Sequence, residues 1–127
     1  QVEGGITATV ERARREGIDL LLEGVHIVPS ARLLKAWEDA GGVTLGVVMV
    51  VDEERAHQAM LKSRDAHSYR RSDRYLASFS RIRSIQEGLI ERAKIANWSI
   101  VDPTRVDNDV ERIFTLLNRA IDAHHED

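Results

Sequence analysis

The sequence predicts an α/β fold in which helices flank a parallel sheet of three strands. Residues 18–22, 43–51 and 98–101 are short, largely apolar runs rich in Val, Ile and Leu, as strands covered on both faces are. Segments with helical apolar spacing separate these runs, and strands that alternate with helices form parallel sheets. With 127 residues, 43% hydrophobic and 31% charged, the chain is expected to be one domain, residues 1–127.

Five segments have the apolar spacing or the flanking residues of helices. Gly17 is a natural left-handed stop for the first helix. Ser30 is expected to cap the second helix and Asp52 to cap the third. The expected helices cover residues 7–16, 30–40, 52–66, 74–96 and 106–123.

Composition excludes several classes of protein and site. Cysteine is absent, which rules out disulfides, thiolate metal sites and cysteine nucleophiles. The five histidines have no spacing typical of a zinc site, so no metal site is predicted within the chain. The longest apolar run, residues 43–51, is too short to span a membrane, and no signal peptide is recognisable. We therefore expect a cytoplasmic protein that has no membrane partner.

Charge is distributed unevenly along the chain. The net charge is −3, yet residues 62–83 carry +5, which leaves −8 for the rest. A short arginine-rich stretch in an acidic protein indicates a local anion site, although a solvated helix face would have the same composition. Because the chain is acidic overall and lacks a base-stacking platform, no nucleic-acid partner is predicted.

A carboxylate and a histidine follow the first expected strand. Glu23 would lie at a strand's carboxyl end, where chemistry occurs in open α/β sheets, and could accept a proton or order a metal-bound water. The alternative is a simple turn or helix cap. His26 by itself would more often be a structural histidine than a base.

The arginine-rich stretch contains the remaining candidates. Arg70, Arg71 and Arg74 would share one helix face if this turn is helical, and guanidinium groups match phosphate oxygens. Arg83 lies beside the apolar stripe of the long helix. Either its stem packs along the core while its head reaches solvent, or its head enters a polar cavity.

Four blocks of sequence resemble the 2-phosphoglycerate kinase family, which is a branch of the P-loop small-molecule kinases akin to the zeta-toxin group. They are Glu-Gly-Val-His-Ile-Val-Pro at 23–29, Arg-Tyr-Leu-Ala-Ser-Phe at 74–79, Ile-Arg-Ser-Ile-Gln at 82–86 and Val-Asp-Pro-Thr-Arg-Val-Asp at 101–107. Their order and spacing fit from about residue 6 to 122. The sequence departs from the family at Ser30, where Gly is frequent, and at Pro103 and Arg105, where Asn is more usual.

The resemblance implies a P-loop-kinase-like sheet with a helical lid, and transfer of the ATP γ-phosphate to a small phosphorylated acid, with Mg²⁺. Glu23, Arg74 and Arg83 would then be catalytic. His26, Arg70 and Arg71 would bind the substrate. Glu23 would meet a metal-bound water or the acceptor hydroxyl, His26 would line the acceptor pocket, and the arginines would neutralise phosphate charge from the lid and its following helix.

The motif G-x-x-x-x-G-K-[ST] does not occur in this sequence. Without that phosphate cradle the chain alone is predicted to be inactive and to bind neither ATP nor Mg²⁺ tightly. In the family, the strand that leads into the P-loop lies between the first two expected strands. We therefore expect the C-terminal portion of a longer P-loop kinase, with an incomplete sheet through which the chain could self-associate. The alternative is a non-catalytic module that binds an anion or a partner protein.

Overall fold

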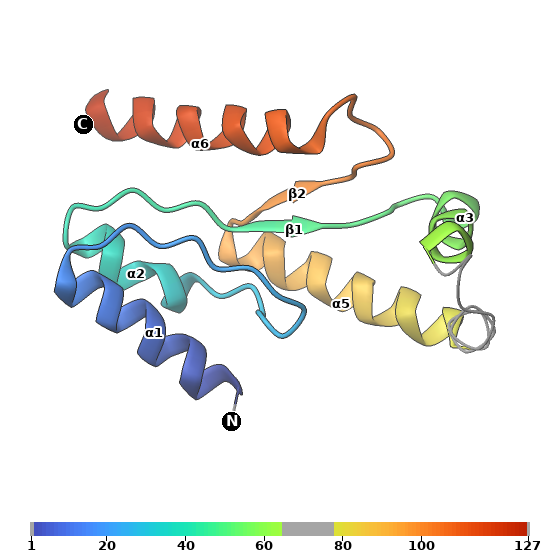
Figure 1. Cartoon of the computed structure of the whole chain (residues 1–127), viewed down its shortest axis with the longest axis horizontal. Helices are drawn as coiled ribbons and strands as arrows, with labels where there is room; N and C mark the ends of the chain where they lie inside the picture. The colour runs from blue at the N-terminus through green and yellow to red at the C-terminus, as the bar shows by residue number, and fades with distance from the viewer. Residues whose placement is uncertain (1, 65–77, 127) are drawn as a thin grey trace.

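The computed structural model describes residues 2–64 and 78–126, which form five helices and two strands in the arrangement shown in Figure 1. The strands alternate with helices along the second half of the chain. In chain order the elements are α1 (Val2–Glu16), α2 (Ala31–Asp39), β1 (Val47–Met49), α3 (Glu54–Arg64), α5 (Phe79–Ala96), β2 (Ser99–Val101) and α6 (Asp109–Glu126).

The two strands form a parallel sheet, as the alternation of elements predicts. Val47, Val48 and Met49 pair with Ser99, Ile100 and Val101, in that order. Two further backbone hydrogen bonds extend the ladder, from Ser99 to the Gly46 carbonyl (2.8 Å) and from Val50 to the Val101 carbonyl (2.9 Å). The pairing therefore ends at Val50.

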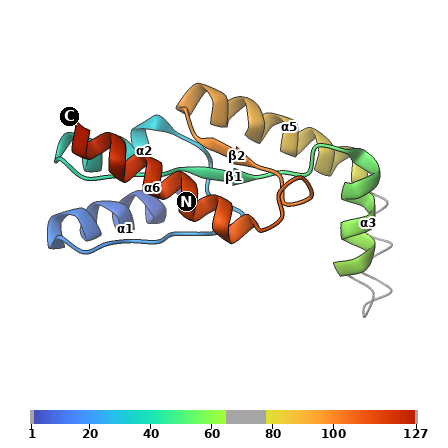
Figure 2. The same cartoon turned by 90° about the horizontal axis from the view of Figure 1, so that it is seen from above.

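The expected third strand, residues 18–22, is not formed. This segment is extended and runs in the same direction as β1 in both views (Figures 1 and 2). Its apolar side chains are exposed, with Leu21 at 92% and Ile18 at 52%. A strand needs a hydrogen-bonding neighbour, and within the described residues no backbone bond joins this segment to β1. The sheet therefore has two strands instead of three.

Helices cover both faces of the sheet. In Figure 1, α5 lies below the strands and α6 above them. Val48 and Val50 pack against Ala93 of α5, and Leu89, Ile90 and Trp98 surround this small core. The indole of Trp98 lies directly on Gly46, where a Cβ atom would overlap the ring. A second contact joins α1 to α2 through Trp37, whose indole N–H donates to the Val10 carbonyl (3.2 Å).

The start of α3 differs from the expectation. Asp52 does not cap this helix; the carboxylate of Glu53 accepts the backbone N–H groups of Arg55 (3.0 Å) and Ala56 (2.9 Å). A residue directly before the first helical turn is well placed to pair those N–H groups. Asp52 is consequently available for other contacts.

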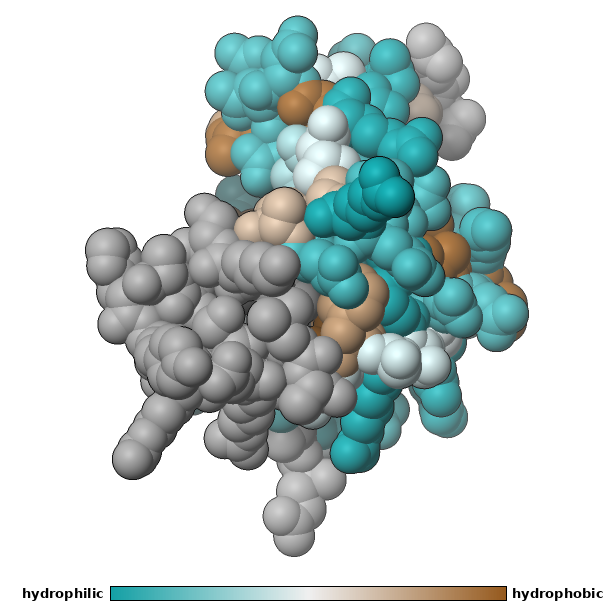
Figure 3. Space-filling model, turned by 90° about the vertical axis from the view of Figure 1, so that its right-hand side faces the viewer, coloured by the Kyte–Doolittle hydropathy of each residue, from teal (hydrophilic) through white to brown (hydrophobic). Residues whose placement is uncertain are grey.

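The helix α3 projects from the end of the molecule toward which both strands run (Figures 1 and 2). Seen from that side, the described surface is mostly hydrophilic (Figure 3).

Candidate functional site

The carboxyl ends of β1 and β2 gather the densest set of long-range polar contacts among the described residues. In open α/β sheets, ligands bind beyond this end of the strands. Here β1 continues through Val50 and Val51 to Asp52, and β2 leads directly to Asp102. Side chains from α3 and α5 reach the same place.

Arg83 and Gln86 of α5 hold the chain where β1 leaves the sheet. Arg83 donates from Nη1 to the Val51 carbonyl and from Nη2 to the Asp52 carbonyl (2.7 Å). The amide of Gln86 donates to the Val51 carbonyl (2.8 Å) and accepts the Val51 N–H (3.0 Å). Of the two orientations left open by the sequence, the head of Arg83 takes the inward one, and its Nε is buried without a partner among the described residues.

His57 brings α3 against these residues. Its side chain is buried, and its Nδ1 lies 3.3 Å from Nη1 of Arg83. The ring also meets Phe79 edge-on, with 5.4 Å between centroids. Burial, together with the positive charge of Arg83, lowers the pKa of His57. The neutral ring can therefore accept a hydrogen bond from Arg83.

A second group of contacts ties the two strand ends together. The carboxylate of Asp102 accepts the N–H groups of Asp52 (2.9 Å) and Thr104 (2.8 Å), as well as the Thr104 hydroxyl. Arg105 pairs with the Asp52 carboxylate (2.8 Å). Burial acts to raise the pKa of Asp102, but the hydrogen bonds from Thr104 and Asp52 and the charge of Arg105 outweigh it, so that this pKa is lowered.

The residues predicted from sequence are only partly brought together. Glu23 and His26 lie exposed in the connection between α1 and α2, and neither makes a hydrogen bond or ion pair with another described residue. Arg70, Arg71 and Arg74 lie outside the described residues. Of the three candidates that the structure describes, Arg83 alone is placed at the carboxyl ends of the paired strands.

Sequence reasoning missed His57, Gln86, Asp52 and Asp102 as site residues. Asp52 and Asp102 each follow an expected strand, so the rule that singled out Glu23 could also have found them. Gln86 stands in the Ile-Arg-Ser-Ile-Gln block. No local signal marks His57, because its role depends on the packing of α3 against α5.

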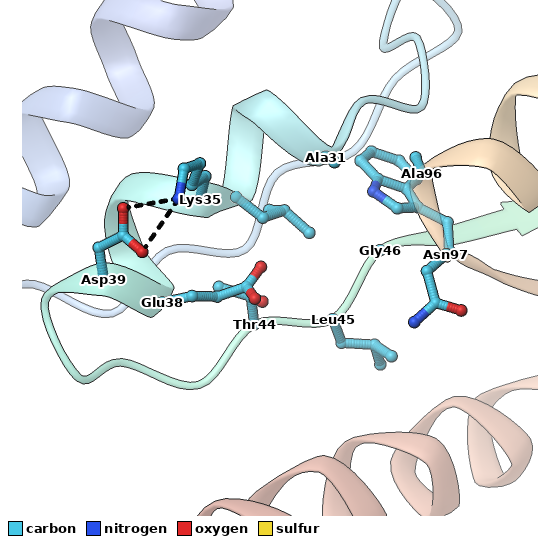
Figure 4. Close-up of a pocket in the computed structure, with 11 residues that line it drawn as sticks. Ala31, Lys35, Glu38, Asp39, Thr44, Leu45, Gly46, Ala96 and Asn97 are labelled. Carbon is cyan, nitrogen blue, oxygen red and sulfur yellow. Dashed lines mark hydrogen bonds and ion pairs between the residues drawn. The ribbon is translucent and has the colours of Figure 1, made fainter.

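A cavity of about 360 Å³ lies at the opposite end of the strands, between α2, the approach to β1 and the end of α5 (Figure 4). It is lined by Lys35 and Asp39, which form an ion pair (3.2 Å), and by Gly46 and Trp98, which precede the two strands. Of the sequence-predicted residues, the three that the structure describes (Glu23, His26 and Arg83) do not line it. Its position at the amino ends of the strands separates it from the polar contacts described above.

No group of three or more His, Asp or Glu side chains in residues 2–64 and 78–126 is arranged to hold a metal ion. No helix in the same ranges is both long and apolar enough to cross a membrane.

The fold and the strand-end contacts define a parallel α/β protein whose polar groups converge at the carboxyl ends of its strands. Comparison with curated proteins confirms the resemblance to 2-phosphoglycerate kinases. The chain is 35% identical over 117 residues to the 2-phosphoglycerate kinase of Methanopyrus kandleri. The matched region covers 90% of this chain and 35% of that protein.

Two more 2-phosphoglycerate kinases give a similar result. The chain is 30% identical to the protein of Pyrococcus horikoshii, and the match covers 86% of this chain and 35% of that protein. It is also 30% identical to the protein of Thermococcus kodakarensis, where the match covers 95% of this chain and 40% of that protein. The chain thus spans well under half of the length of these relatives. No protein-family model and no solved structure matches it.

Proposed function

We propose that this chain is the C-terminal, lid-bearing portion of an ATP-dependent kinase that phosphorylates a small phosphorylated acid such as 2-phosphoglycerate. The observation that carries the proposal is the similarity to 2-phosphoglycerate kinases over about nine tenths of the chain. The convergence of polar groups at the carboxyl ends of β1 and β2 supports it, because this is where α/β proteins bind ligands.

The lid is assigned to the arginine-rich stretch between α3 and α5. The helix α3, which precedes this stretch, stands beyond the strand ends (Figures 1 and 2), on the side of the sheet where α/β proteins bind ligands. In this proposal Arg70, Arg71 and Arg74 neutralise phosphate charge, as arginines do in phosphoryl transfer.

Glu23 and His26 are assigned to the acceptor side of the site. Residues 18–22 run in the same direction as β1 (Figures 1 and 2). Glu23 comes directly after this segment, as a residue at the carboxyl end of a parallel strand would. There Glu23 would hold the acceptor hydroxyl or a metal-bound water, and His26 would line the pocket. Arg83 acts at the end of β1, where its guanidinium already has protein partners.

The cofactors ATP and Mg²⁺ belong, in this proposal, to the complete protein. The sequence of this chain contains no G-x-x-x-x-G-K-[ST] motif, and its described residues form no group that fits a metal ion. The residues present therefore do not fit these cofactors by themselves, and we expect the isolated chain to be inactive.

The test is an assay of the complete natural polypeptide that contains this sequence, supplied with ATP, Mg²⁺ and 2-phosphoglycerate. We expect ADP to form together with a doubly phosphorylated glycerate, because 2-phosphoglycerate has one free hydroxyl group. Phosphorus NMR would follow both products. Glycerate and 3-phosphoglycerate serve as matched acceptors, which should react more slowly.

Two outcomes would contradict the proposal. A complete protein that carries the phosphate-binding motif but leaves 2-phosphoglycerate unchanged would defeat the substrate assignment. A complete protein that lacks the motif altogether, yet binds a phosphorylated metabolite or a partner protein, would replace the kinase with the non-catalytic binding module.

A further inference from the structure

The chain leaves the sheet at a point where its backbone would lose its hydrogen-bonding partners. The last bond of the ladder joins Val50 to Val101. Val51 follows and is only 7% exposed. A buried peptide N–H or carbonyl without a partner costs free energy, so this position needs substitutes for the missing neighbouring strand.

Two side chains of α5 supply these substitutes. Gln86 pairs with both the N–H and the carbonyl of Val51, in the manner of a neighbouring strand. Arg83 donates to the Val51 carbonyl as well as to the Asp52 carbonyl. Because residues three apart lie on one helix face, a single face of α5 holds both peptide units.

The guanidinium group of Arg83 is directed at the protein. Its two Nη atoms donate to backbone carbonyls, one of them also approaches His57, and Nε is buried. No carboxylate pairs with Arg83 within the described residues. To contact a transferring phosphate, the guanidinium group of Arg83 would have to give up these bonds.

We propose that Arg83 and Gln86 form a clamp that fixes the carboxyl end of β1, and that Arg83 is a positioning residue for phosphoryl transfer instead of a phosphate ligand. The fixed segment includes Asp52, whose N–H and side chain are joined to Asp102 and Arg105. The clamp thus aligns the ends of both strands. Its role in the reaction rests on the proposed kinase function; its role in holding the strand end does not.

The test compares Arg83→Lys and Gln86→Met in the complete protein. Lysine keeps the charge but donates from a single nitrogen, without the planar fork whose two Nη atoms reach the Val51 and Asp52 carbonyls separately. Methionine keeps the size of Gln86 without its hydrogen bonds. Hydrogen–deuterium exchange of peptides covering residues 47–57 should be about tenfold faster in both variants, because each loses bonds to the strand end. Exchange in residues 2–16 should not change, which shows that the variants fold.

Steady-state kinetics supply the second readout. Since a misplaced strand end impairs the reaction more than binding, kcat should fall roughly 10- to 100-fold in both variants while KM for ATP and for the acceptor stays within about twofold. Arg92→Lys is the matched control, because Arg92 lies exposed on the same helix. It should leave both exchange and kcat unchanged.

Three results separate the explanations. Unchanged exchange in both variants would overturn the clamp. Faster exchange in Gln86→Met with normal kcat, together with a raised KM in Arg83→Lys, would overturn the positioning role and make Arg83 a phosphate ligand. If the complete protein has no kinase activity, faster exchange still supports the clamp while the kinase proposal fails.

Discussion

At the scale of single residues, the contact of Trp98 with Gly46 shows how closely the chain packs beside the sheet. Trp98 immediately precedes β2 and Gly46 immediately precedes β1, and a Cβ added at Gly46 would lie only 2.2–2.5 Å from three ring atoms of the indole. Any side chain at position 46 would have to displace the ring, which also packs against Val48, Val50 and Ala93. The absence of a side chain there is therefore a requirement of packing.

Replacing Gly46 by Ala should destabilise the protein by about 1–3 kcal/mol, the usual cost of overpacking a core. Urea unfolding of the complete protein followed by tryptophan fluorescence would measure the change. Gly88→Ala is the matched control on α5, where a Cβ meets no atom within 4 Å. It should stabilise the helix by about 0.5–1 kcal/mol. Equal effects of the two changes would contradict this account.

Arg83 illustrates how a single residue can satisfy a sequence pattern in more than one way. Its place beside an apolar stripe left two orientations open, and only the resemblance to the kinase family implied a phosphate contact. The contacts with Val51 and Asp52 join residues more than 30 positions apart. Local periodicity carries no information about such a pairing, so the sequence could indicate that Arg83 matters but not what it binds.

At the scale of elements, α5 connects the core to the candidate site. The carboxyl-terminal half of the helix packs Leu89, Ile90 and Ala93 under the sheet. Its first turns carry Arg83 and Gln86, which hold the end of β1. The same rigid helix therefore sets the position of the sheet and of the strand end.

The contact between α3 and α5 should depend on pH through His57. Its pKa is lowered in the folded protein, so the unfolded chain binds more protons as the pH falls through about 6.5, the ordinary value for histidine. Stability is therefore lost on the acid side of that value and is retained above it. The pKa of Asp102 is also lowered. Because Asp102 is a carboxyl group, its protonation reduces stability at a lower pH than that of His57 does.

Thermal unfolding of the complete protein between pH 5.5 and 8 would measure this effect against His57→Gln, which does not titrate. The difference between the two midpoints should change in favour of the variant as the pH falls. Two curves that stay parallel over this range would show that His57 does not couple protonation to the packing of α3.

The order of most elements was predictable, whereas three details were not. Residues 43–51 have the composition of a strand, but β1 covers only Val47–Met49, with flanking ladder bonds at Gly46 and Val50, because the facing strand is equally short. The expected strand at residues 18–22 has no partner in the described chain, and an apolar pattern cannot supply one. Capping by Glu53 instead of Asp52 depended on where the strand end was held.

At the scale of the whole molecule, the described structure leaves an unusual amount of apolar surface exposed. Leu20, Leu21 and Leu22 are 40%, 92% and 37% exposed, and Phe114 of α6 is 59% exposed. Within the described residues, β1 has a neighbouring strand on one side only. Exposed apolar segments and unpaired strand edges promote association.

The isolated chain is therefore expected to self-associate through residues 18–22. Sedimentation velocity at increasing concentration should detect dimers or larger species, and Leu21→Glu should return the chain to monomers. Ile95→Glu is the matched control, because Ile95 is also apolar and highly exposed, at 86%, but lies on α5. Association that persists in Leu21→Glu, or disappears in Ile95→Glu, would contradict this assignment.

The sequence by itself determined the class of fold, the order of most elements and the resemblance to 2-phosphoglycerate kinases, because these depend on local composition and on short blocks of residues. Tertiary structure alone decided that α5 holds the end of β1, that His57 lies against Arg83, and that Asp52 and Asp102 meet. These contacts join segments far apart in the chain. Arg83, predicted from its sequence block as a phosphate ligand, is placed by those contacts at the end of the strand.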